Sequence, residues 1–263
     1  MARSPASVRH RTSLGGTSLD EARRRLVFPL DFATYDEARA AASRVASSIG
    51  VLKIGLELFV REGPRAVQIG RDLGLDVFLD LKLLDIPQTV ARTVAAAADL
   101  GVRYLTVHAA GGAEMMRRAA VEAGRADGLI LLAVTVLTSL DDADLSSHGV
   151  QEGAAKQALR LAQLARGAGI RGFVTSPTEV QALRQALGKD ALLVTPGIRP
   201  TLDGAPAAGA ASNEDQKRTA TPTGAVAAGA DLLVIGRPIR DAADPPAAAR
   251  SILQEIARAL SAR

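Results

Sequence analysis

Four charged side chains of this sequence, Asp31, Lys53, Asp80 and Lys82, each lie at or just beyond the end of a short apolar run. Removing such ions from water is costly unless they are well paired, so a stabilising role alone would be a poor reason to gather them. Functional sites are where this cost recurs. A fixed ammonium group can stabilise negative charge that develops on a substrate and then donate a proton. The four residues, with Asp85 close by, therefore predict a catalytic site.

The elements that would position these charges alternate regularly. Short β-branched or leucine-rich runs predict strands at 26–30, 51–54, 76–81, 104–107, 130–134, 172–175, 192–195 and 232–235. Longer alanine-rich stretches predict helices at 35–47, 59–72, 88–100, 112–124, 154–168, 177–187, 222–228 and 245–260, and a capping box predicts a short helix at 18–25. Eight strand–helix units favour a parallel α/β sheet closed into a (β/α)8 TIM barrel, formed by residues 18–263 as one domain. An open doubly wound sheet is the alternative, but no G-x-G-x-x-G follows the first strand.

The charges fall on the inner face of this barrel. Successive side chains of a strand point to opposite faces, so Phe78, Asp80 and Lys82 point inward together. Asp31 and Lys53 do so by the same parity. Catalytic residues of such barrels lie at the carboxyl ends of the strands, which is where these charges stand. Pro29 is a local misfit, because a closed sheet needs the N–H group that proline lacks.

Composition limits the class of protein. The chain of 263 residues suits a barrel, which typically has about 250. Cysteine is absent, so disulfides and thiolate metal sites are excluded. The longest apolar runs are too short to cross a bilayer, and no signal-peptide pattern stands at the start. We expect a cytoplasmic enzyme with no membrane partner.

The positive charge is unevenly distributed. Residues 1–25 carry six arginines against two acidic residues, which accounts for the whole net charge of +4. The Ser-, Arg- and Gly-rich residues 1–17 predict a disordered basic tail. Aromatic residues make up only 3% of the chain, whereas nucleic-acid binders usually interleave their basic patches with stacking aromatics. We therefore expect no nucleic-acid partner.

Two segments near the end of the chain suit a phosphate group. The Gly236-Arg237 turn follows the eighth expected strand, at the usual phosphate site of these barrels. Arg199 follows the seventh strand. The long segment 200–217, rich in small residues and ending near Gln216, predicts a lid over that site, with a tolerated insertion as the alternative.

The string Asp80-Leu81-Lys82-Leu83-Leu84-Asp85-Ile86-Pro87 resembles the D-x-K-x-x-D signature of the orotidine 5′-phosphate decarboxylase suprafamily. Further segments are similar to the orotidine enzymes of short bacterial type, in the same order: 30–32, 53–55, 107–109, 135–139, 195–200, 215–218 and 234–238. The resemblance covers about residues 26–240. It implies a cofactor-free and metal-free carboxy-lyase of de novo pyrimidine biosynthesis, which converts orotidine 5′-phosphate to UMP and carbon dioxide.

The resemblance also implies roles for matching residues. Lys82 would donate a proton to C6 of the pyrimidine, and Asp80 would lie beside the substrate carboxylate, with Lys53 and Asp85 completing a charged chain. The remaining substrate contacts would be made by Asp31 and Lys53 to the ribose, Thr138 and Ser139 near the pyrimidine, and Arg199, Gln216, Gly236 and Arg237 at the phosphate.

A homodimer is implied as well, in which Asp85 and Thr89 reach into the partner's site. Leu84 stands where many members of the family carry histidine, and Gln88 where many carry asparagine. These departures put the fit of the dimer-crossing loop in question. His108 ends the fourth expected strand, and a structural role is favoured for it over a catalytic one.

Two other functions remain open. One is a sugar-phosphate decarboxylase or aldolase of the same suprafamily, which would bind Mg²⁺ and carry glutamate in place of Lys53; an ammonium group there would repel the metal. The other is a catalytically silent barrel that binds phosphate or nucleic acid through its basic tail. The intact set of charged residues disfavours it.

Overall fold

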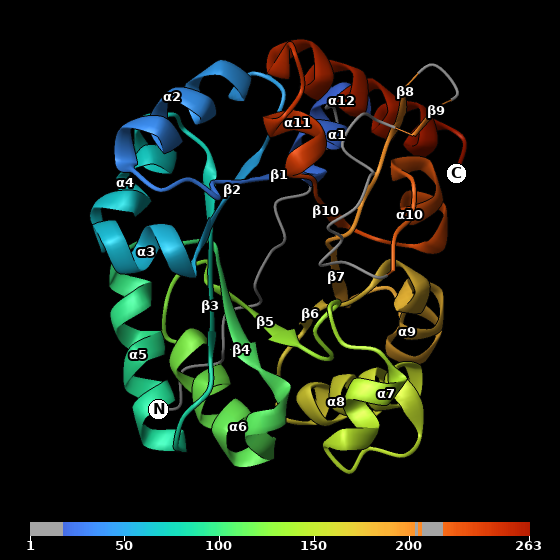
Figure 1. Cartoon of the computed structure of the whole chain (residues 1–263). Helices are drawn as coiled ribbons and strands as arrows, with labels where there is room; N and C mark the ends of the chain where they lie inside the picture. Colours follow the sequence, from blue (N-terminus) through green and yellow to red (C-terminus); the bar gives the residue numbers. More distant parts are fainter. Residues whose placement is uncertain (1–17, 203–204, 207–217) are drawn as a thin grey trace, which may run out of the picture.

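The computed structural model describes residues 18–202, 205–206 and 218–263, and it is a closed barrel of eight parallel strands in the order β1-β10-β7-β6-β5-β4-β3-β2. Helices form a ring around these strands (Figure 1). The predicted (β/α)8 fold is thereby confirmed. The barrel strands are β1 Leu26–Pro29, β2 Val51–Gly55, β3 Asp76–Leu83, β4 Tyr104–His108, β5 Ile130–Val134, β6 Gly172–Val174, β7 Leu192–Thr195 and β10 Leu232–Val234.

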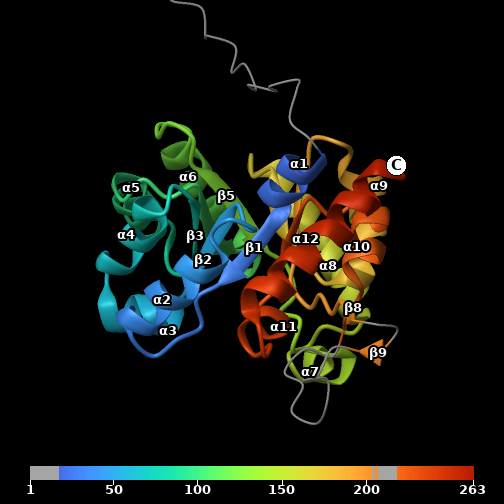
Figure 2. The ribbon, with the colours of Figure 1, turned by 90° about the horizontal axis from the view of Figure 1, so that it is seen from above.

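The helices follow the strands as the alternation predicts, with additions. They are α1 Ser18–Arg25, α2 Tyr35–Val45, α3 Leu56–Glu62, α4 Arg65–Asp72, α5 Pro87–Asp99, η1 Ala109–Gly111, α6 Gly112–Ala123, α7 Asp142–Ser147, α8 Gly153–Gly167, η2 Pro177–Glu179, α9 Val180–Leu187, α10 Pro222–Ala228, α11 Arg237–Arg240 and α12 Pro245–Ser261. The amino-terminal α1 lies beside α12 in both ribbon views (Figures 1 and 2). No described helix is both long enough and apolar enough to cross a membrane.

The structure differs from the expected elements in three places. The helix expected at 59–72 is divided into α3 and α4, because Gly63 ends α3 with φ 58° and Pro64 precedes α4. The short helices α7 and α11 were not predicted; a capping box between Asp141 and Asp144 begins α7. Within the segment 200–217, which was expected to form a lid, β8 Thr201–Leu202 pairs antiparallel with β9 Ala205–Pro206. The tail, residues 1–17, lies outside the described residues.

The core has two layers. Inside the barrel, side chains from alternate positions of seven strands pack together: Val27, Val51, Phe78, Tyr104, Leu132, Val194 and Leu232. The rings of Phe78 and Tyr104 meet edge to face, with centroids 6.3 Å apart. A larger apolar layer lies between the strands and the surrounding helices. The inner layer fills the barrel below the strand ends, so it forms the floor of the space that opens there.

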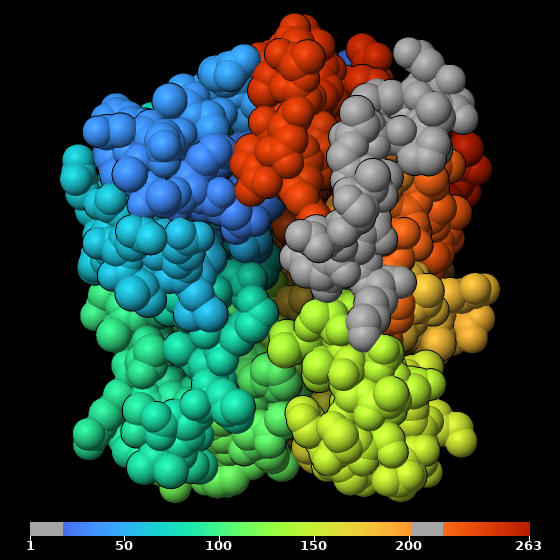
Figure 3. All heavy atoms as spheres, in the orientation of Figure 1, coloured from blue at the N-terminus to red at the C-terminus, as the bar shows by residue number. Residues whose placement is uncertain are grey.

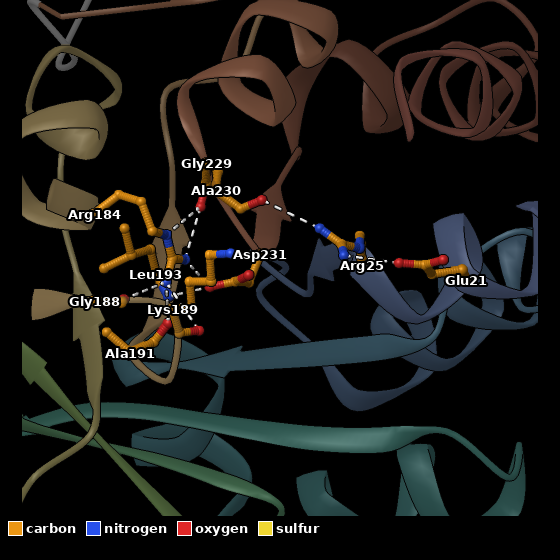
Figure 4. Close-up of polar contacts among 10 residues, drawn as sticks. All are labelled: Glu21, Arg25, Arg184, Gly188, Lys189, Ala191, Leu193, Gly229, Ala230 and Asp231. Carbon is orange, nitrogen blue, oxygen red and sulfur yellow. Dashed lines mark hydrogen bonds and ion pairs between the residues drawn. The ribbon is translucent and has the colours of Figure 1, made fainter. Parts of the chain in front are cut away.

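The amino-terminal ends of the last strands are tied by a polar network (Figure 4). Arg184 on α9 donates to Asp231, 2.5 Å away, and to the carbonyl oxygens of Ala191 and Gly229. Asp231 also accepts from the backbone of Leu193 at 2.7 Å. Polar ties at this end of a barrel stabilise it and leave the opposite end free for chemistry.

Pro29 fits β1 because of the side on which its nitrogen lies. Leu30 donates its N–H to Lys53 in β2 at 2.8 Å, so the nitrogen of the preceding residue faces β10. The pairing of β1 with β10 ends at Val27–Val234, so it stops before Pro29 is reached. The missing N–H of Pro29 therefore faces β10 beyond the part of β1 that pairs with β10, and the sequence misfit is resolved without a bulge.

Candidate active site

Four of the predicted charges form one continuous chain at the carboxyl ends of β1, β2 and β3. Lys53 Nζ lies 3.4 Å from Asp31 Oδ1 and 3.6 Å from Asp80 Oδ2. Lys82 Nζ lies 2.9 Å from both oxygens of Asp80. The side chains of Lys53 and Asp80 are each only 13% exposed, whereas that of Lys82 is 33% exposed. Of the two ammonium groups among these four charges, that of Lys82 is thus the more open to a ligand.

Adjacent strand ends bring these residues together, as strand parity predicts. Lys53 pairs with Pro29 on one side and with Phe78 on the other, which places it between Asp31 and Asp80. Gly55 leaves room for this arrangement, since a Cβ at that position would lie 3.2 Å from Lys53 Nζ.

Lys82 has a strained backbone. Its φ of 49° makes it the one non-glycine residue with positive φ in the described part of the chain. The register between β3 and β4 shifts between Leu79 and Leu83, so the regular ladder is interrupted at this point. Residues held in this conformation cost of order 1–3 kcal/mol and cluster at functional sites. From this backbone the side chain of Lys82 reaches Asp80.

The neighbouring charges determine the protonation state of Asp80. Burial alone would raise the pKa of its carboxyl group, but the ammonium groups of Lys53 and Lys82, with hydrogen bonds from Lys82 and Thr106, hold that pKa below its ordinary value. Asp80 is therefore a carboxylate at neutral pH.

A pocket of about 270 Å³ opens above this chain, a size that suits one small ligand. Figure 3 shows the face of the molecule onto which it opens, where the units around β2–β4 lie opposite α7 and α8. Apolar side chains from around the barrel also line the pocket: Phe78, Val134, Val136, Val174, Pro196 and Val234. The predicted residues that line it are Asp31, Lys53, Asp80, Lys82, Thr138, Arg199, Gly236 and Arg237.

The far end of the pocket is cationic. Arg199 and Arg237 follow β7 and β10 and both line it. Gly236 caps α11, and a Cβ there would lie 2.8 Å from Cγ of Pro29, so only glycine fits against the proline ring. Arg199 is positioned by its backbone, whose N–H donates to Ala220 at 2.8 Å. Two guanidinium groups and a backbone turn suit an anion such as a phosphate.

Several predicted residues are not brought to this pocket. Asp85 and Thr89 are exposed and do not line it, and Asp85 accepts a hydrogen bond from its neighbour Ile86 at 2.6 Å. Ser139 is exposed, unlike Thr138. Gln216 and most of the expected lid, 203–204 and 207–217, lie outside the described residues. Within one chain, the predicted participation of Asp85 in the charged chain is absent from the described contacts.

His108 has the structural role favoured for it. Its Nδ1 accepts a hydrogen bond from Ala110 at 3.3 Å and so caps the 3-10 helix η1. Burial, and then the charge of Lys82, lower the pKa of His108, so the ring is neutral at physiological pH.

Two residues that make polar contacts at or near the site were missed by sequence reasoning. The hydroxyl of the fully buried Thr106 contacts both Asp80 and the backbone of Lys82. Arg218 pairs with the buried Glu179 and donates to the carbonyl oxygen of Leu137 at 3.3 Å. Neither has a sequence signal of its own, although Arg218 belongs to the segment 215–218 that carried part of the resemblance.

Comparisons of the sequence with a family model and with curated proteins agree on one family. A sequence model of the orotidine 5′-phosphate decarboxylase / HUMPS family matches residues 24–252. The chain is 54% identical over 228 residues to an orotidine 5′-phosphate decarboxylase of Anaeromyxobacter sp. (strain K), covering 87% of this chain and 96% of that protein. It is 45% identical over 248 residues to the decarboxylase of Syntrophotalea carbinolica, covering 92% of this chain and 98% of that protein.

Solved structures include a similar fold. The crystal structure of orotidine 5′-phosphate decarboxylase from Lactobacillus acidophilus superimposes with a TM-score of 0.76 at 34% sequence identity, covering 89% of this chain and 99% of that one.

Proposed function

The chain belongs to the orotidine 5′-phosphate decarboxylase / HUMPS family, and from this premise we propose that it is the carboxy-lyase that converts orotidine 5′-phosphate to UMP and carbon dioxide in pyrimidine biosynthesis. The observation that carries the proposal is the chain Asp31–Lys53–Asp80–Lys82, in which a lysine stands between two carboxylates at the mouth of the barrel. No cofactor enters the proposed reaction.

Lys82 is the proposed proton donor. When the bond between C6 and the carboxyl carbon breaks, its electron pair stays on C6 as an sp² carbanion and carbon dioxide leaves. An ammonium group fixed nearby stabilises that charge without having to reorganise. Lys82 Nζ then gives a proton to C6, and solvent returns one to the lysine. Its contact with both oxygens of Asp80 supports this role, because the pair fixes the direction of the ammonium group.

Asp80 is proposed to lie beside the carboxylate of the substrate. Two like charges at short distance repel each other, and the repulsion ends when carbon dioxide leaves. The lowered pKa of Asp80 supports this, since the residue is charged in the free protein, before the substrate binds. Asp31 and Lys53, at the other end of the series of charges from Lys82, are proposed to hold the ribose hydroxyls.

The opposite end of the pocket is proposed to bind the phosphate through Arg199, Arg237 and the backbone of Gly236, with Gln216 as a further contact. Thr138, on the loop after β5, is proposed to contact the pyrimidine, and Ser139 to lie near it. Binding energy from the phosphate, remote from C6, can order the charges around the reacting carbon.

A sugar-phosphate reaction with Mg²⁺ is disfavoured by Lys53. Its ammonium group lies within 4 Å of both carboxylates that a metal ion would need there. Incubating the protein with orotidine 5′-phosphate, and separately with a hexulose phosphate and Mg²⁺, distinguishes the two functions. We expect UMP and carbon dioxide in the first reaction and no turnover in the second; the reverse would refute the proposed function.

We further propose a homodimer in which Asp85 and Thr89 complete the partner's site. Both are exposed on the segment after β3, and large apolar side chains are exposed beside them and on the neighbouring unit: Leu84, Ile86, Leu56 and Val60. An apolar surface of this kind is typical of a protein interface. Gln88, which departs from the family pattern, accepts from Arg118 at 3.0 Å within the same chain, so its side chain is held away from the pocket.

A further inference from the structure

Thr106, at the centre of β4, is fully buried although it is polar. Its hydroxyl group donates to Asp80 Oδ1 at 3.0 Å and accepts from the backbone N–H of Lys82 at 2.8 Å. A single hydroxyl therefore contacts the side chain of one charged site residue and the backbone of the other.

The register shift in β3 explains why this hydroxyl is needed. In a regular strand the N–H of Lys82 would face β2, the side on which Asp76 donates to Gly50 at 3.1 Å. The ladder is interrupted between Leu79 and Leu83, and the N–H of Lys82 instead faces β4. There the Thr106 hydroxyl accepts it in place of a ladder carbonyl. Without it, the N–H of a residue with φ 49° would lose its partner, at the point where the backbone is already strained.

The two bonds also fix each other's direction. A threonine hydroxyl has one proton, and the N–H of Lys82 can only donate. The oxygen must therefore accept from Lys82, which leaves its proton for Asp80. The carboxylate of Asp80 is thus held by Thr106 on one oxygen and by Lys82 Nζ on both.

We propose that Thr106 is a positioning residue for the decarboxylation, whose hydroxyl holds the carboxylate of Asp80 and the left-handed backbone of Lys82 as one unit. The inference rests on the proposed function and deepens it. Thr106 does not line the pocket, so it acts through Asp80 and Lys82 and not on the substrate.

The charge balance around Asp80 supports this role. Burial raises the pKa of the carboxyl group; Lys53 from β2, Lys82 from β3 and the Thr106 hydroxyl from β4 lower it. Asp31 faces Lys53, and His108 at the end of β4 faces Lys82 as a neutral ring. Loss of the hydroxyl removes one of the groups that stabilise the charged form, so Asp80 is protonated at a higher pH.

The chain offers a matched control. Thr195 on β7 is equally buried, but its hydroxyl has no hydrogen-bond partner among the described residues. Changing either threonine to valine keeps the side-chain shape and removes one hydroxyl. Only the change at position 106 breaks contacts with the charged chain.

The test compares Thr106→Val, Thr106→Ser and Thr195→Val with the wild type, using orotidine 5′-phosphate as substrate. We expect kcat of Thr106→Val to be about tenfold to a hundredfold lower, with KM changed by less than about threefold. As the pH is lowered, kcat of Thr106→Val should also begin to fall at a higher pH than kcat of the wild type. Thr106→Ser should restore most of the activity, and Thr195→Val should match the wild type.

A kcat of Thr106→Val within twofold of the wild type, or a serine variant no better than the valine variant, would overturn the proposal. An equal loss of kcat in Thr195→Val would also overturn it, because the loss would then come from changed packing and not from the broken hydrogen bonds.

A ¹³C NMR titration of the Asp80 carboxyl group, without substrate, separates this proposal from the proposed function. A higher pKa in Thr106→Val supports the positioning role even if the wild type has no decarboxylase activity, and an unchanged pKa contradicts it.

Discussion

Pro29 and Gly236 are in such close contact that a methyl group at position 236 would lie 2.8 Å from Cγ of the proline ring. The contact joins the first strand of the barrel to the start of α11, next to Arg237. Both residues look like exceptions in the sequence, a proline in a closed sheet and a glycine before a helix. Together they determine how closely the last turn of the barrel approaches the pocket.

Gly236→Ala should therefore weaken phosphate binding. The proline ring is rigid, so the added Cβ must displace the start of α11 and with it Arg237. We expect KM for orotidine 5′-phosphate to rise about tenfold or more, since small misplacements of binding groups have effects of this order. Steady-state kinetics measure it. Gly167→Ala is the control, because a Cβ at that exposed position on α8 meets nothing within 4 Å; equal KM values for the two variants would contradict the prediction.

Lys53→Gln should shift the pH dependence of catalysis. Lys53 is the leading cation that holds the pKa of Asp80 below its ordinary value, so its loss raises that pKa. A carboxyl group with a raised pKa takes up a proton at higher pH, and kcat of the variant should fall at a higher pH on the acid side. We also expect kcat to be at least about a hundredfold lower at neutral pH, as is typical when one preorganised charge is lost. If kcat of Lys53→Gln falls at the same acidic pH as kcat of the wild type, this account is contradicted.

The Glu179–Arg218 pair should matter for stability more than surface pairs do. Glu179 is only 4% exposed and accepts from Thr175 at 2.8 Å as well. Arg218→Ala leaves this buried carboxylate unpaired and should lower the free energy of unfolding by about 3–5 kcal/mol. Urea unfolding measures it.

The exposed Arg160–Glu152 pair is the matched control, and Arg160→Ala should cost less than about 1 kcal/mol. Adding Glu179→Gln to Arg218→Ala should recover part of the loss, because the buried charge is then gone. A double variant less stable than Arg218→Ala would refute this explanation.

The sequence was most informative where a physical rule links position to geometry. Strand parity placed Lys53 and Asp80 on one face, and the structure has them 3.6 Å apart. No such rule covers Asp85, because β3 ends at Leu83 and parity has no meaning beyond the last strand residue. Its role in the partner's site, implied by the resemblance, stays a prediction. Thr106 could not be predicted, since its role depends on a register shift that a lone threonine in a strand does not reveal.

The shared site of the proposed dimer can be tested by combining two inactive variants. Lys82→Ala lacks the proton donor, and Asp85→Ala lacks the residue proposed to reach the partner. In a mixed dimer one site regains both residues, so co-expression should restore about a quarter of the wild-type activity. Each variant alone is the control. If the mixture stays inactive although sedimentation shows mixed dimers, Asp85 acts within its own chain or has no catalytic role.

The most direct test of the account follows the absorbance of the orotate chromophore after wild-type protein is added to orotidine 5′-phosphate in the presence of EDTA, with Lys82→Ala measured alongside. We predict rapid loss of absorbance with the wild type and none with the variant. That result would establish both the metal-independent decarboxylation and the need for Lys82. No loss with the wild type, together with turnover of a sugar phosphate when Mg²⁺ is supplied, would contradict the assignment of Lys53 and Lys82.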